Sequence, residues 1–304
     1  MKPKAMKSTG DRHLSSDIAH ALQRNPYRFR VWVNAGLTGL AALCTAIVIL
    51  PLVAVLVYVV VQGAQRLDIA LVTQLPPAPL AEGGGLGNAI VGTLLVVGLA
   101  TLIAVPLGVF AAIYLTEYRG NHRLVRSIRF ATNVLSGIPS IIAGVFAYGM
   151  LVATGLTGYS AIAGAVALSM LMIPTIVRTT DEALQLVPFD MRLGASAIGA
   201  TRYQSILRIV LPAALPSIIT GIVLAIARAS GETAPLIFTA LNSSFWPRGV
   251  LEPIASLSVT VYTFATAPFE NQQELAWAGS LILVVLVLLT SAIARLVARR
   301  ARIS

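Results

Sequence analysis

Charged side chains are scarce in this sequence. Asp, Glu, Lys and Arg make up 11% of the 304 residues, whereas a soluble domain carries about 25%. Hydrophobic residues make up 57%. This balance excludes an ordinary soluble domain.

Cysteine and lysine are rarer still. Cys44 is the only cysteine, so no disulfide can form within the chain. Lysine occurs only at Lys2, Lys4 and Lys7, which excludes a phosphate-binding loop of the pattern GxxxxGKS or GxxxxGKT. The three histidines lack the spacing of metal ligands, and no Ser/His/Asp set is evident. We therefore expect no catalytic site, metal or cofactor in this chain, and any nucleotide that drives its function must bind another chain.

The few charged residues leave long uncharged segments between them. Five segments contain no Asp, Glu, Lys or Arg: 31–65, 83–116, 130–177, 209–227 and 275–294. A helix needs roughly 20 residues to cross a bilayer. The third run is long enough for two crossings, which the Gly-containing stretch 154–158 separates. The sequence therefore predicts an all-α polytopic membrane protein with six transmembrane helices.

The basic residues collect in alternate segments. Of the 22 Lys and Arg, 19 lie in residues 1–30, 116–129, 178–208 and 295–304. Positive residues accumulate on the cytoplasmic side of membrane proteins, so we predict that both termini and the 178–208 loop are cytoplasmic. The net charge of +10 is explained by this pattern, and we expect a lipid bilayer and no nucleic acid as partner.

Arg228 lies at the end of an apolar run, four residues before Glu232. Residues at this spacing share a helix face and can pair. An arginine near the bilayer centre costs roughly 2.5–3.5 kcal/mol on insertion scales, and two reasons for it remain open. The pair holds helices together, or the guanidinium recognises an oxyanion while Glu232 moderates its hold so that the cargo leaves. Intramembrane charges usually mark a pathway, which favours the second reason.

The 178–208 segment is the longest loop on the predicted cytoplasmic side. Pro188, Gly194 and Gly199 are expected to break it into short helices with a turn between them. The segment is either an ordinary connector or a rigid hairpin that docks on a partner.

This loop resembles that of the membrane-spanning permease subunits of ATP-binding-cassette (ABC) importers. Their pattern is EAA, three residues, Gly, nine residues and Ile-x-Leu-Pro, and the matching residues here are Ala195, Gly199, Ile209, Leu211 and Pro212. Leu193 and Gly194 stand where the family has Glu and the first Ala. The resemblance implies the type I ABC importer permease fold and a coupling loop over 178–212. The residues it implies for ATPase contact are Ala195, Gly199, Arg202, Ile209, Leu211 and Pro212.

A closer resemblance links the chain to the permeases of phosphate-specific transport (Pst) importers, of the PstA rather than the PstC type. It runs from about residue 85 to 299, and its most specific marker is 227–240, which contains Gly-Glu-Thr-Ala-Pro at 231–235. Arg228 and Glu232 correspond to the charged pair that the family uses in anion passage, and Thr233 follows them.

The resemblance also implies a set of partners and a division of the chain. The partners are a PstC-type companion permease, a PstB-type ATPase dimer that holds ATP and Mg, and a PstS-type periplasmic phosphate-binding protein. The chain itself is a non-catalytic subunit of the bacterial inner membrane. We expect a basic cytoplasmic tail over 1–30, a first transmembrane helix and outer loop over 31–85, the permease domain over 86–298 and a second tail over 299–304.

Two alternatives stand beside this prediction. The cargo is a different oxyanion, phosphonate or sulfate, because an arginine alone does not separate anions that share charge and donor geometry. Or the chain is a secondary transporter driven by an ion gradient, which predicts internal repeats with broken helices in corresponding positions. No convincing repeat is visible in the sequence.

Overall fold

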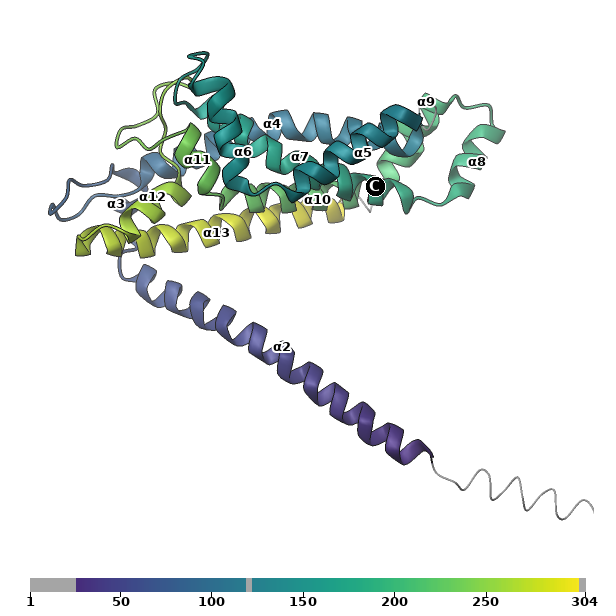
Figure 1. Cartoon of the computed structure of the whole chain (residues 1–304), viewed down its shortest axis with the longest axis horizontal. Coiled ribbons are helices and arrows are strands. Elements are labelled where there is room, and N and C mark those ends of the chain that lie inside the picture. Colours follow the sequence, from purple (N-terminus) through teal and green to yellow (C-terminus); the bar gives the residue numbers. More distant parts are fainter. Residues whose placement is uncertain (1–25, 119–121, 301–304) are drawn as a thin grey trace, which may run out of the picture. The chain divides into compact units, whose positions relative to one another are not determined.

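The computed structural model describes residues 26–118 and 122–300, which are helices joined by loops (Figure 1), with no strand among them. The chain divides into two compact units, Met1–Tyr58 and Val59–Ser304. The predicted basic tails lie mostly outside the described residues, and the predicted domain boundaries stay predictions.

Helix α2 (Pro26–Ala64) is the first crossing, and it begins earlier than the uncharged run that predicted it. Its stretch Arg30–Ala64 is long and apolar enough to span a membrane. Large apolar side chains all round it are exposed, among them Leu43, Val48 and Leu56. A helix without a polar face suits a lipid environment.

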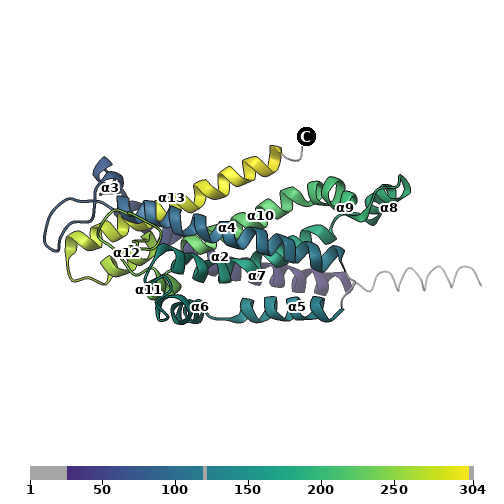
Figure 2. The ribbon, with the colours of Figure 1, turned by 90° about the horizontal axis from the view of Figure 1, so that it is seen from above.

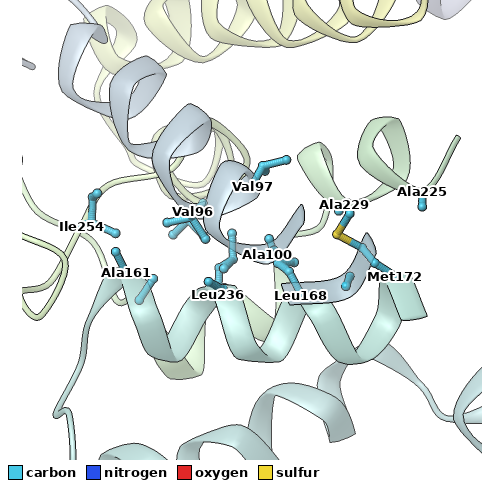
Figure 3. Packing of buried hydrophobic residues seen from close by; sticks show 14 of the residues in the cluster. Val96, Val97, Ala100, Ala161, Leu168, Met172, Ala225, Ala229, Leu236 and Ile254 are labelled. Carbon is cyan, nitrogen blue, oxygen red and sulfur yellow. The ribbon is translucent and has the colours of Figure 1, made fainter. Parts of the chain in front are cut away.

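The second unit is built on four long helices: α4 (Gly87–Glu117), α7 (Ala161–Gln185), α10 (Leu211–Ser230) and α13 (Glu270–Arg300). Each contains a stretch apolar and long enough to cross a membrane. Their main core contains Val96 and Ala100 of α4, Leu168 and Met172 of α7, and Ala229 of α10 (Figure 3). Small residues at these contacts let helices approach closely, which stabilises helix pairs in lipid.

The third predicted crossing is broken. We expected one helix over about 130–153, but α5 (His122–Gly137) and α6 (Ser140–Ala147) meet at an angle of 108°. The break falls at Ile138-Pro139, because a proline ring disfavours helical backbone at the residue before it. Pro139 also occupies the N-cap position of α6, where no side chain caps the first amides.

Both halves of this broken helix lie along α7 (Figure 2). The second half continues as a π-helical turn, η1 (Tyr148–Val152). The described residues therefore contain five helices able to span a membrane, and six spans if the bent pair counts as one. On that count the six predicted crossings are confirmed, and the third is not a straight helix.

The predicted cytoplasmic loop starts later than residue 178. Helix α7 continues through Pro174 and ends at Gln185, so Arg178, Asp181 and Glu182 are helical. The residues of this last stretch include good helix formers such as Ala, Leu, Glu and Gln, which explains the extension.

The loop itself holds α8 (Phe189–Ala197), α9 (Arg202–Ser205) and the π-helical turn η2 (Ile206–Val210). Pro188 precedes α8 as expected, whereas Gly194 lies inside it and breaks nothing. Gly199 has a φ of +79°, which glycine adopts without steric cost, and it forms the turn between α8 and α9. Thr201 and Gln204 form a capping box at α9, which fixes where that helix begins.

Three short helices lie at the opposite end of the second unit: α3 (Ile69–Thr73), α11 (Ala234–Thr239) and α12 (Leu257–Ala265). The last of them, α12, is fixed by a contact with α4. Its start is held by Thr93 of α4, whose Oγ1 accepts a 2.8 Å hydrogen bond from the backbone N–H of Leu257. The Asn88 side chain donates to the carbonyl of Ser243 at 2.7 Å. These bonds tie the loops around α11 and α12 to the start of α4.

Candidate functional site

Arg228 and Glu232 form an ion pair, as their spacing predicts. Arg228 lies in the last turn of α10, and Glu232 follows the end of that helix. The Arg228 Nε and Glu232 Oε1 atoms are 3.6 Å apart. The backbone carbonyl of Glu232 accepts a hydrogen bond from Ser258 Oγ of α12 at 2.9 Å. Glu232 is therefore anchored through its backbone, while its side chain faces the arginine.

The two partners differ in exposure. The Arg228 side chain is 67% exposed in the chain, and the Glu232 side chain is 18% exposed. The ion pair uses only Nε, so the two NH2 groups of the guanidinium are not needed for it. Arginine can therefore present further donors to an oxyanion while it keeps its carboxylate partner.

A cavity of about 200 Å³ lies beside Arg228 at the break between α5 and α6. Its lining comes from α5 and the break, from α7 and from α10: Leu135, Ser136, Ile138, Leu171, Pro174, Thr175, Arg178, Thr179 and Arg228. The wall is apolar apart from two arginines and three hydroxyl groups. An enclosure of this kind, with a few convergent polar groups, is the usual form of a small-ligand site.

Arg178 is the residue at this cavity that the sequence analysis missed as a candidate for the anion pathway. It was assigned to the cytoplasmic loop because of its charge, whereas it lies on α7 and pairs with Glu182 through Nε and Oε1 at 3.2 Å. One signal was available. Arg178 and Glu182 repeat the spacing of Arg228 and Glu232.

Thr233 lies at the N-cap position of α11. Its carbonyl accepts hydrogen bonds from the N–H groups of Leu236 and Ile237 at 3.1 and 3.2 Å. It is not part of the lining of the cavity beside Arg228, and its place in a pathway stays a prediction.

The residues predicted to contact an ATPase lie along the segment from α8 to the start of α10. Ala195 is buried, Gly199 forms the turn, and Ile209, Leu211 and Pro212 fall where η2 passes into α10. The Arg202 guanidinium lies 5.0 Å from the centre of the Tyr118 ring, a distance at which a cation is attracted to an aromatic face. This contact joins α9 to the end of α4.

Arg192 of α8 fixes the loop to two long helices. Its Nη2 lies 2.9 Å from Glu117 Oε1 at the end of α4, and the side chains are 22% and 9% exposed. The same guanidinium donates to the carbonyls of Leu184 and Val187, each at 2.8 Å. One arginine thus connects α8 with the ends of α4 and α7, and no local sequence pattern predicts this contact.

Asp181 makes a second connection at this end of the unit. Its Oδ1 accepts a 2.7 Å hydrogen bond from Thr116 of α4, and its Oδ2 lies 3.5 Å from Arg129 Nη2 of α5. Three helices meet at this carboxylate. Within the described residues, no group of three His, Cys, Asp or Glu side chains is placed to hold a metal ion.

Comparison with known proteins identifies the family to which the chain belongs. Residues 104–303 match the model of the binding-protein-dependent transport system inner membrane component. The chain is 43% identical to the phosphate transport system permease protein PstA of Yersinia pestis, over 81% of this chain and 83% of that protein. It is also 43% identical to PstA of Haemophilus influenzae, over 86% and 93%.

Solved structures give the same fold. The chain resembles one from the crystal structure of a bacterial alginate ABC transporter in complex with alginate pentasaccharide-bound periplasmic protein, with a TM-score of 0.63 and 17% identity. The match covers 91% of this chain and 98% of that one. The fold is therefore that of a type I ABC importer permease, and the chain belongs to the family of inner membrane components of binding-protein-dependent transport systems.

Proposed function

We propose that this chain forms half of a heterodimeric channel that carries inorganic phosphate across the bacterial inner membrane. The observation that carries the proposal is its 43% identity, over more than four fifths of its length, to proteins named as phosphate transport permeases. The companion half is a PstC-type permease, and a PstS-type periplasmic protein delivers phosphate. A pair of PstB-type ATPase subunits binds ATP and Mg, so this chain is a non-catalytic subunit.

Arg228 and Glu232 supply the anion chemistry in this proposal. The exposed guanidinium attracts a phosphate ion with charge and with paired N–H donors. The carboxylate, 3.6 Å from Nε, competes with the ion for the same guanidinium. This competition keeps the hold weak enough for release, which conduction requires. Thr233, next to Glu232, adds a hydroxyl to the same stretch of the pathway.

The segment from α8 to η2 receives force from the ATPase. Four apolar side chains support this role, because all of them are exposed on the hairpin: Phe189, Leu193, Ile198 and Tyr203. The hairpin itself is held by Arg192 and Arg202. Exposed apolar groups gathered on one hairpin mark an interaction surface. Arg202 and the residues of the family pattern, Ala195, Gly199, Ile209, Leu211 and Pro212, lie within or beside this hairpin.

The transport cycle follows from these two parts. ATP binding closes the ATPase pair, tilts the two coupling loops and opens the pathway to the outside, where phosphate arrives from the binding protein. ATP hydrolysis resets the pathway toward the cytoplasm. In this orientation α8 and both termini are cytoplasmic, while α11 and α12 face outward.

Phosphate uptake by Arg228→Ala tests the proposed role of the charged pair. The whole transporter is reconstituted in proteoliposomes with ATP inside and the binding protein outside, and uptake of radiolabelled phosphate is measured. We expect uptake to fall by at least ~10-fold, because a charge-assisted contact with the ion is lost. Complex assembly is followed by co-purification of the ATPase. Undiminished phosphate-selective uptake by the variant would remove the role given to Arg228.

Competition separates phosphate from the other oxyanions. We expect excess unlabelled phosphate to abolish uptake of the label, and equal excesses of sulfate or a phosphonate to leave most of it. Strong competition by sulfate or phosphonate would assign the transporter to that anion instead.

A further inference from the structure

Two cavities follow one another along α7. The first is the cavity of about 200 Å³ beside Arg228. A second, of about 290 Å³, lies toward the end of α7 that leads to α8, and its lining residues are Leu115, Arg129, Thr132, Asn133, Ser136, Val177, Arg178, Asp181 and Glu182. Ser136 and Arg178 belong to both linings. Arg178 therefore stands where the two spaces meet.

An arginine with a carboxylate partner occurs at each stage of this series. Arg228 pairs with Glu232 at 3.6 Å, Arg178 with Glu182 at 3.2 Å, and Arg129 with Asp181 at 3.5 Å. The first two have the same spacing of four residues in the sequence. The two arginines lie on neighbouring helices, Arg228 on α10 and Arg178 on α7, and both line one cavity.

The Arg178–Glu182 pair is open to exchange. The two side chains are 75% and 63% exposed, and exposed ion pairs contribute little to folding stability. An anion in either cavity can therefore bind the Arg178 guanidinium in place of Glu182, and no buried contact has to break. Arg129 differs from it, because its partner Asp181 is largely buried and also accepts a hydrogen bond from Thr116.

Two of the three hydroxyl groups in the first cavity, those of Ser136 and Thr179, are already used as donors. Ser136 donates to the carbonyl of Thr132 at 2.8 Å, and Thr179 donates to the carbonyl of Thr175 at 2.9 Å. Where hydroxyls are engaged in this way, guanidinium groups are the strong donors left for a tetrahedral oxyanion.

We propose that Arg178 is a second anion-binding residue, which takes phosphate from Arg228 across the first cavity and passes it to the second. This inference rests on the proposed function and adds an inner position to its pathway. Glu182 does for Arg178 what Glu232 does for Arg228: it competes with the ion and returns the guanidinium to its paired state when the ion leaves. The two positions together divide the passage through the membrane into shorter steps, as multi-site conduction requires.

Radiolabelled phosphate uptake by the complete transporter in proteoliposomes tests this position. With Arg178→Gln we expect the maximal rate of uptake to fall by ~10-fold or more, because a charge-assisted contact is lost. Stimulation of ATP hydrolysis by the phosphate-loaded binding protein should persist, since α8 and its contacts are unchanged. Arg126→Gln is the matched control, because Arg126 is an exposed arginine of α5 outside both linings, and it should transport like the wild type.

Two further variants distinguish an anion site from a structural role. Arg178→Lys keeps the charge and should recover part of the rate. Because a lysine at this position can also pair with Glu182, Glu182→Gln makes the distinction: loss of a purely structural pair would not lower KM. Glu182→Gln removes the competitor, so both KM and the maximal rate should fall as the ion is held longer.

The outcomes separate this inference from the function on which it rests. If the wild type transports phosphate and Arg178→Gln matches it in KM and maximal rate, the inner position is wrong and the proposed function stands. If Arg178→Gln loses stimulated ATP hydrolysis together with uptake, and lysine restores neither, Arg178 is structural and the inference is overturned. If the wild type prefers sulfate or a phosphonate over phosphate, the proposed function fails first.

Discussion

At the scale of single residues, the difference in exposure between the Arg228 and Glu232 side chains is the main consequence of where α10 ends. The helix stops at Ser230, so the arginine projects from a regular turn while the glutamate lies in the link to α11. Burial of Glu232 and exposure of Arg228 follow from these positions. The arginine is therefore the partner that can turn toward an arriving ion.

Glu232→Gln should slow the release of phosphate. The amide keeps the shape of the side chain but no longer offers a negative charge to Arg228, so the guanidinium holds the ion more tightly. We expect KM for phosphate and the maximal uptake rate both to fall, by ~3-fold to ~10-fold, the size of effect expected when one charged contact is altered. An increased maximal rate with an unchanged KM would contradict the role of Glu232 in release.

At the scale of helices, α4 and the chain before α12 approach too closely for an extra methyl group. A Cβ atom built on Gly92 would meet the backbone carbonyl oxygen of Ala255, whereas one built on Gly98 of the same helix meets nothing within 4 Å. Backbone atoms cannot rotate aside as a flexible side chain can. The packing of α4 thus depends on Gly92 and not on Gly98.

Gly92→Ala should destabilise the protein, and Gly98→Ala should not. Overpacking of a well-packed contact costs ~1–3 kcal/mol, while alanine in an open helical position is favourable by up to about 1 kcal/mol. The measurement is the Tm of each variant in detergent, with a lower value expected only for Gly92→Ala. Equal Tm values for the two variants would show that the chain before α12 moves away at no cost.

The contact between α8 and α4 is a second feature at this scale. Arg192 and Glu117 are partly or largely buried, and Arg192 also satisfies two backbone carbonyls at the end of α7. A buried charge that loses its partner costs about 1–3 kcal/mol or more. This guanidinium therefore holds α8 in position, beside the contact of Arg202 with Tyr118 that holds α9.

Arg192→Ala should uncouple ATP hydrolysis from transport. Without the guanidinium, α8 loses its ion pair with α4 and its hydrogen bonds to Leu184 and Val187, so movement of α8 is passed less completely to the transmembrane helices. We expect ATP hydrolysis to continue while phosphate uptake falls by ~10-fold or more, as for loss of a buried charge pair. Ser196→Ala on the same helix is the control. The exchanged pair, Arg192→Glu with Glu117→Arg, should restore part of the uptake, and its failure together with normal uptake by Arg192→Ala would refute this role.

At the scale of the whole molecule, the crossings were predictable and their interruptions were not. Each uncharged run of roughly 20 residues or more corresponds to a long helix, and the longest, 130–177, corresponds to the bent pair and α7, because charge is the strongest limit on what enters a bilayer. The pairing of Arg228 with Glu232 was predictable from local spacing. The Arg192–Glu117 pair, by contrast, joins residues 75 positions apart, and local patterns carry no information about such a contact.

The break at Ile138-Pro139 shows a second reason why the interruptions could not be predicted from the sequence. Glycine and proline, here Gly137 and Pro139, disfavour a regular helix, but a proline inside a membrane helix is often tolerated, as Pro51, Pro106 and Pro174 are here. The bend of 108° places both halves against α7, and contacts between segments so far apart in the chain are not visible in a local pattern. Arg178 was missed for a related reason, since its charge was taken to mark a loop.

The predicted orientation of the whole chain can be tested with cysteines. Cys44 is the only cysteine, so Cys44→Ala provides a background without thiols. In intact cells, a membrane-impermeant maleimide should label Ser244→Cys, in the loop after α11, and should label Ser196→Cys, on α8, only after the membrane is opened. Labelling of Ser196→Cys in intact cells would reverse the orientation.

The start of α6 has a consequence for water. Pro139 takes the capping position and provides no side-chain acceptor. Its carbonyl accepts hydrogen bonds from the N–H groups of Ile142 and Ala143, so the amides of Ser140 and Ile141 need partners from outside the helix. Inside a bilayer, lipid tails cannot supply them. This end of α6 is therefore expected to face protein or a water-filled space and not lipid, so the bend exposes backbone donors on the inner side of the bundle.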